Sequence, residues 1–137
     1  MRIQLSNWTR IAGSLLMCGA LAWAIKLAVI ISTNGRIIDT GAAALLMKIG
    51  LITFFVGSTG IGSRLTHNRH LVLRILSVIL SPVIIFASFM LFPAITGPLF
   101  KNSSTWYAQE ESPIGLAVLV YAMVGYYLYR SANALKA

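Results

Sequence analysis

Two lysines stand inside long apolar stretches of the sequence, where a charged side chain is unusual and chemically useful. Lys26 lies five residues before the end of its stretch, and Lys48 lies six residues after the start of its own. At about 1.5 Å of rise per helical residue, both ammonium groups would lie about 7–9 Å inside the same apolar boundary. Cations at this depth can receive an anion or a lipid headgroup, or can pair with Asp39, Glu110 or Glu111.

The alternative for each lysine is that its alkyl stem runs along the helix and carries the ammonium group outward to water. Small residues share the helical face of Lys26, namely Cys18, Gly19 and Ala22. They favour contact between that face and another helix. Large apolar side chains share the face of Lys48, which is typical of a surface that contacts lipid. We therefore expect Lys48 to extend toward water, whereas the sequence leaves both orientations open for Lys26.

A second polar cluster lies between the second and third apolar stretches and is rich in arginine and histidine. It consists of Arg64, His67, Arg69, His70 and Arg74. These donors are dense enough to hold the phosphate of an anionic lipid, although membrane topology alone also requires a basic cytoplasmic turn. The spacing of His67 and His70 suits a shared metal ion, but no carboxylate or thiol is near in sequence and the arginines would repel a cation. We predict contact with anionic lipid and no metal site.

Glu110 and Glu111 are adjacent carboxylates between the third and fourth apolar stretches. A pair of carboxylates can act as acid and base at a surface. Adjacent side chains point in different directions, however, and the sequence offers neither a nucleophile nor a metal partner for them. With Ser112 and Pro113 they are typical of the start of a helix, where carboxylates complement the helix dipole. We predict no catalytic residue here.

Four apolar runs must position these residues, and they cover about 11–31, 42–61, 71–95 and 114–130. As helices they can cross a hydrocarbon core of about 30 Å, the last run being at the short limit. The chain has 137 residues and is 58% hydrophobic and 10% charged, whereas soluble domains are about 25% charged. Short connections favour antiparallel neighbours. The sequence predicts one all-α membrane domain, 1–137, with four transmembrane helices in an up-down bundle and no soluble domain.

Basic residues outside the runs divide unequally between the two sides of the predicted membrane. Seven flank one side: Arg2, Arg10, Arg64, Arg69, Arg74, Arg130 and Lys136. The other side has Arg36 and Lys101, together with all three carboxylates. The positive-inside rule therefore predicts an inner-membrane protein with both termini and the 62–70 turn in the cytoplasm. This topology accounts for the net charge of +8, so we expect membrane lipids and no nucleic acid among the partners.

The first run also has features of a secretory signal peptide. Arg2 and Arg10 precede it, and Ala20-Leu21-Ala22 resembles a cleavage site. Apolar residues continue to Ile31, however, and a run of about 21 residues suits a membrane span better than a signal peptide. We expect residues 1–22 to remain in the protein as part of the first helix.

Packing between the predicted helices is expected to rest on small residues, because lipid supplies no hydrophobic force between helices. The candidate strips contain Ala20, Ala24 and Ala28, then Gly50, Gly57, Gly60 and Gly62, and finally Ala117, Tyr121 and Gly125. In the third helix, Pro82 predicts a kink at which Ser77 or Ser81 bonds a carbonyl that the proline frees. Pro93 and Pro98 are expected to end that helix.

The sequence contains little that points to catalysis or to a cofactor. A single cysteine, Cys18, cannot form an internal disulfide or a redox pair. No acidic residue lies inside a run, although proton-coupled exporters usually need one at membrane depth. We predict a non-enzymatic interaction or accessory subunit, with a membrane protein or a second copy as partner. The alternatives are a transporter or lipid- and anion-binding protein that uses Lys26 and Lys48, and an outer-face enzyme that uses Glu110 or Glu111.

Overall fold

The computed structural model describes residues 2–38 and 40–134, and the side chains from residue 7 onward in those ranges. These residues form four helices and no strand: α1 (Arg2–Ser32), α2 (Gly41–Leu65), α3 (Leu71–Phe100) and α4 (Ala108–Ala134). All four helices are long and apolar enough to cross a membrane. The prediction of an all-helical chain with four candidate spans is therefore confirmed.

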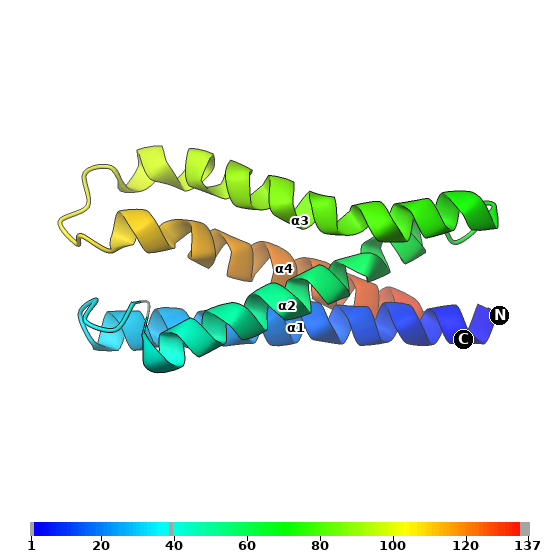
Figure 1. Cartoon of the computed structure of the whole chain (residues 1–137), viewed down its shortest axis with the longest axis horizontal. Coiled ribbons are helices and arrows are strands. Elements are labelled where there is room, and N and C mark those ends of the chain that lie inside the picture. The colour runs from blue at the N-terminus through cyan, green and yellow to red at the C-terminus, as the bar shows by residue number, and fades with distance from the viewer. Residues whose placement is uncertain (1, 39, 135–137) are drawn as a thin grey trace.

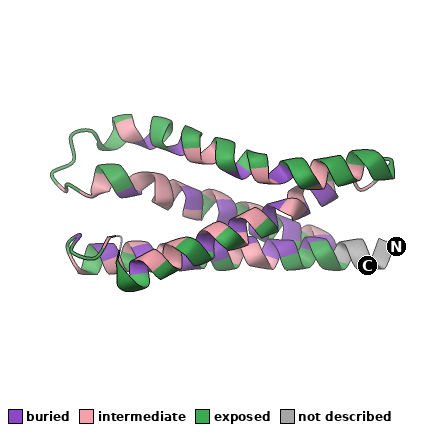
Figure 2. Cartoon of the chain, viewed as in Figure 1, coloured by how far each residue is buried: buried purple, intermediate pink, exposed green. Residues whose placement is uncertain are grey.

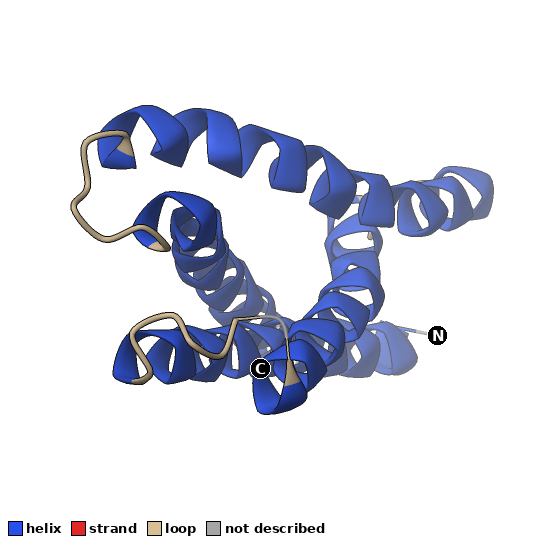
Figure 3. Ribbon diagram, turned by 60° about the vertical axis from the view of Figure 1, so that its left-hand side comes forward, coloured by secondary structure: helices blue, strands red, loops and turns tan. Residues whose placement is uncertain are grey.

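Consecutive helices run in opposite directions along the molecule, so the start of α1 and the end of α4 lie at the same end (Figure 1). Helix α1 packs against α2 and α4, and α3 also packs against α2 and α4, whereas the described backbones of α1 and α3 do not come close to each other. Helix α2 crosses obliquely from the side of α1 to the side of α3. The loops that join α1 to α2 and α3 to α4 lie together at the other end (Figure 3).

The third and fourth helices are longer than the sequence predicts. Pro93 and Pro98 do not end the third helix, which continues to Phe100, and the fourth begins at Ala108, six residues before the apolar run. A proline removes only one backbone donor, and an apolar environment penalises an unwound backbone more heavily than a single lost hydrogen bond. The prediction that the prolines terminate α3 is therefore wrong.

Serine hydroxyls replace two of the hydrogen bonds that prolines remove. Ser81 Oγ donates to Val78 O at 2.8 Å, the carbonyl that would otherwise accept from the missing N–H of Pro82. The Ser112-Pro113 pair repeats the arrangement, with the serine Oγ 3.3 Å from the carbonyl oxygen four residues before its proline. The predicted use of Ser81 is confirmed, and the same device allows α4 to begin early.

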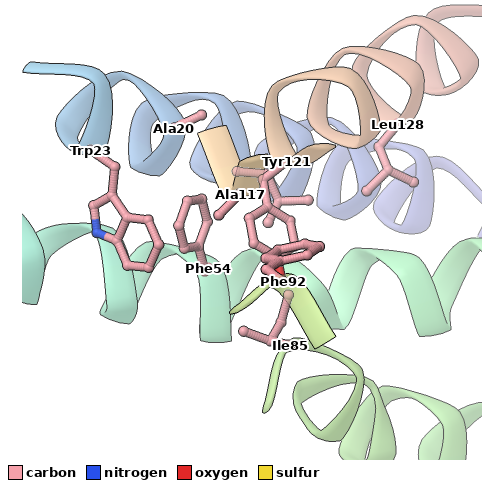
Figure 4. Packing of buried hydrophobic residues seen from close by; sticks show 9 residues of the cluster. Ala20, Trp23, Phe54, Ile85, Phe92, Ala117, Tyr121 and Leu128 are labelled. Carbon is pink, nitrogen blue, oxygen red and sulfur yellow. The ribbon is translucent and has the colours of Figure 1, made fainter. Parts of the chain in front are cut away.

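An aromatic cluster joins all four helices where their buried faces meet (Figures 2 and 4). Trp23 of α1 meets Phe54 of α2 edge-on, with ring centroids 4.9 Å apart, and stacks against Phe89 of α3 at 5.5 Å. Tyr121 of α4 lies 4.4 Å from Phe54, and its hydroxyl shares a hydrogen bond with that of Ser88. The ring contacts fix the relative heights of the four helices.

Small residues allow the helices to approach closely around this cluster. All five glycines of the predicted strips are buried against another helix: Gly50, Gly57, Gly60, Gly62 and Gly125. Helices α1 and α4 cross closely enough that a Cβ at Gly13 would lie 2.6 Å from Gly125 O and 2.8 Å from Tyr129 N. Two predicted small residues of α1 do not pack in this way, because Cys18 and Ala28 are exposed.

Candidate functional site

Lys26 and Glu111 form a buried ion pair between α1 and α4. The Lys26 Nζ lies 3.2 Å from Glu111 Oε2 and 3.3 Å from Oε1, so one ammonium group donates to both carboxylate oxygens. Lys26 is 2% exposed and Glu111 is 7% exposed. Each charge is therefore met by the other at a position that water hardly reaches.

The helix ends explain why these two residues meet. Lys26 is six residues before the end of α1, or about 9 Å along the axis. Glu111 lies in the first turn of α4, and the two helices run in opposite directions, so both residues come to the same height. Of the other carboxylates proposed as partners, Glu110 is exposed and Asp39 lies outside the described residues.

Pairing changes what Lys26 can do chemically. A buried lysine without a counter-charge is strongly unfavourable, and Glu111 supplies the counter-charge here. An external anion would have to compete with a carboxylate already bound through both oxygens. The ion pair links α1 to α4, and Glu111 already occupies the buried ammonium group. An anion could bind Lys26 only if Glu111 moved away.

Lys48 behaves differently from Lys26. It is exposed on α2, and the described residues contain no ion pair other than Lys26–Glu111. The structure thus does not bring the two predicted lysines together in one site. The exposed position agrees with a lysine whose stem lies along an apolar helix and whose ammonium group extends to water.

A cavity of about 470 Å³ lies beside the ion pair, between the ends of α1, α3 and α4. Its walls are almost wholly apolar and come from all three helices, with Leu27 and Ile30, Leu99 and Phe100, and Leu116 and Leu119 as main contributors. Glu111 lines it but Lys26 does not. Its rim reaches the outer surface of the bundle, because Leu99 is 75% exposed and Leu119 is 64% exposed. The volume falls in the range of about 300–1,000 Å³ that is usual for ligand pockets.

The arginine- and histidine-rich cluster is at the opposite end of the molecule from this cavity. A second cavity, also of about 470 Å³, is lined there by Arg64, Leu65, His67, Asn68 and Arg69. His70 and Arg74, which the sequence grouped with them, lie outside its lining; His70 is exposed and Arg74 is half-buried. The structure therefore divides the predicted cluster into a cavity lined by four polar residues and one leucine, and two flanking residues, His70 and Arg74.

Comparison with known proteins gives no further guide to function. No protein-family model matches the chain, and no curated protein or solved structure is significantly similar to it. In the described part of the chain, no three or more histidine, cysteine or acidic side chains are grouped so as to hold a metal ion. The ion pair and the two cavities are therefore the features of the molecule that bear on its function.

Proposed function

We propose that this chain is a small multi-pass membrane protein that binds the apolar chain of a lipid, or of a similar amphiphile, in the cavity beside Glu111. The observation that carries this proposal is the apolar lining of that cavity and its opening onto an apolar surface. A pocket that opens sideways between transmembrane helices is reached from the bilayer, where acyl chains are the abundant apolar ligands. The role is one of binding, without catalysis.

Three observations favour lipid binding over an anion transporter, an outer-face enzyme and an accessory subunit. An anion transporter built on Lys26 would need a polar cavity at its depth, whereas the cavity found there is apolar. An enzyme built on the two carboxylates would need them to converge, whereas Glu110 is exposed and Glu111 is buried. An accessory subunit that docks through small residues would leave its glycine strips free, whereas the buried glycines pack within the bundle. Association with a partner through other surfaces is compatible with lipid binding.

The proposed membrane placement is an up-down bundle in the inner membrane with both termini in the cytoplasm. Four candidate spans and the unequal distribution of basic residues support it. The ion pair and the apolar cavity then lie in the outer half of the bilayer, and the basic turn after α2 lies at the cytoplasmic surface. Lys26 would be held about 9 Å inside the outer end of α1.

Cysteine labelling tests this placement, since the chain has only one cysteine of its own. In a Cys18→Ala background, Ser103→Cys should react with a membrane-impermeant maleimide in intact cells. Asn68→Cys should react only after the membrane is permeabilised. Both native side chains are exposed, so neither substitution disturbs packing. The reverse labelling pattern would contradict the proposed topology.

Filling the cavity tests the binding role. Gly115 lines the cavity, and a Cβ there would meet only Leu27 Cδ1, at 3.9 Å. We expect Gly115→Phe to reduce co-purified lipid by about tenfold, because the ring would take up volume that an acyl chain needs. The readout is mass spectrometry of lipids retained after purification in mild detergent.

The matched control for this substitution is Gly97→Phe. Gly97 lies near the same end of the bundle but outside the cavity lining, and a Cβ there would have no neighbour within 4 Å. This variant should retain as much lipid as the wild type. If Gly115→Phe is folded, as judged by circular dichroism, and still retains the wild-type amount, the cavity is not the binding site.

A further inference from the structure

We infer that the cavity after α2 binds the headgroup of an anionic phospholipid from the cytoplasmic leaflet. Arg64, His67, Asn68 and Arg69 supply its polar lining. This site is separate from the apolar cavity, and the inference rests on the proposed membrane placement but not on binding at the other end.

The chemistry of the lining matches a phosphodiester. The guanidinium groups of Arg64 and Arg69 are always charged and can each donate two parallel hydrogen bonds to phosphate oxygens. The Asn68 amide and the His67 ring can add further donors. The cavity lining contains no acidic residue, so no side chain of the lining competes with the phosphate for the two arginines.

The start of α3 adds to this positive field. His70, the residue before α3, makes no capping hydrogen bond through its side chain, and the first turn of the helix contains no acidic residue. The leading N–H groups of α3 therefore present the positive end of the helix dipole at the same turn. Arg74, one turn into α3, contributes a further cation nearby.

Apolar residues at the same turn indicate a lipid as the source of the phosphate, in preference to a soluble compound. Leu65 lines the cavity and is 74% exposed, and Leu71 and Val72 at the start of α3 are 57% and 75% exposed. At a membrane surface these side chains would contact the glycerol and upper acyl region of the same lipid. A free phosphate compound has no acyl chain that could contact these apolar side chains.

The test compares binding of phosphatidylglycerol and phosphatidylcholine to the full chain in detergent by native mass spectrometry. The wild type should prefer phosphatidylglycerol. The double variant Arg64→Gln/Arg69→Gln should lose about 25-fold in affinity for phosphatidylglycerol, from a factor of about five for each arginine. Its affinity for phosphatidylcholine should change little.

The control removes the same charge elsewhere on the cytoplasmic side. Arg10 and Arg130 are exposed and lie outside the cavity, so Arg10→Gln/Arg130→Gln should keep the preference for phosphatidylglycerol. An equal loss in both double variants would overturn the inference in favour of diffuse attraction to net charge. Displacement of phosphatidylglycerol by millimolar inorganic phosphate would overturn the lipid assignment in favour of a soluble phosphate ligand.

Discussion

Replacing Lys26 by methionine is expected to lower the stability of the bundle by about 3–5 kcal/mol, because Glu111 would remain as a buried charge without a partner. Both side chains are almost fully buried, and both carboxylate oxygens accept from the same ammonium group. Glu111→Leu should cost less, since Lys26 lies near the end of α1 and its freed ammonium group can extend outward to water. Unfolding by SDS in mixed micelles measures each loss.

A double-mutant cycle separates the pairing from the packing of the two side chains. Lys26→Met/Glu111→Leu removes both charges, and we expect it to recover most of the stability that Lys26→Met loses, since an apolar pair of similar volume can replace a buried ion pair. Lys48→Met removes an exposed lysine and should change stability by less than about 0.5 kcal/mol. If Lys26→Met behaves like Lys48→Met, or if the losses at the two sites simply add, the ion pair does not hold α1 to α4.

Alanine at the α1–α4 crossing should destabilise the protein by about 1–3 kcal/mol, the usual cost of overpacking. A Cβ at Gly13 would lie 2.6 Å from Gly125 O, and one at Gly125 would lie 2.7 Å from Gly13 O. These neighbours are backbone atoms that cannot rotate away, so the two helices would have to separate. Thermal melting followed by far-ultraviolet circular dichroism measures the effect for Gly13→Ala and for Gly125→Ala.

The same substitution at Gly97 should have the opposite sign. A Cβ there has no neighbour within 4 Å, so Gly97→Ala gains the helix propensity of alanine, about 0.5–1 kcal/mol, without a clash. Equal melting temperatures for the three alanine variants would show that the α1–α4 crossing tolerates a side chain. The sign difference is informative because all three substitutions add one methyl group to a helical glycine.

The fold class could be predicted from the sequence because long apolar runs in lipid have few structural choices other than helices. The ends of the helices could not be predicted from the sequence in the same way. The apolar run that begins at residue 114 marks where α4 becomes lipid-compatible, whereas the helix itself begins at Ala108 and includes Glu111. Ser112 meets the carbonyl that Pro113 leaves without a donor, so a proline that suggests a boundary in the sequence lies inside the helix.

The candidate site was only partly accessible from sequence. The small residues beside Lys26 indicated a face turned toward another helix, and Glu111 was one of three proposed partners. Choosing among them requires the relative height of two helices whose paired residues are 85 positions apart, which no local pattern contains. The apolar cavity depends on how α3 diverges from α1. The sequence places Tyr121 in a packing strip of the fourth helix but does not predict its contacts with other aromatic rings, and it does not predict the central position of Trp23.

The separation of Lys26 and Glu111 along the chain has a consequence for biosynthesis. If the helices enter the bilayer in the order in which the ribosome makes them, the first delivers a cation whose counter-ion arrives only with the last. The insertion machinery would therefore hold an uncompensated charge while α2 and α3 emerge, and a chain interrupted before residue 111 would retain it. Neutralisation of Lys26 then requires that the start of α4 has been made, and products truncated before it would present a charged first helix to the proteases that remove unassembled membrane proteins.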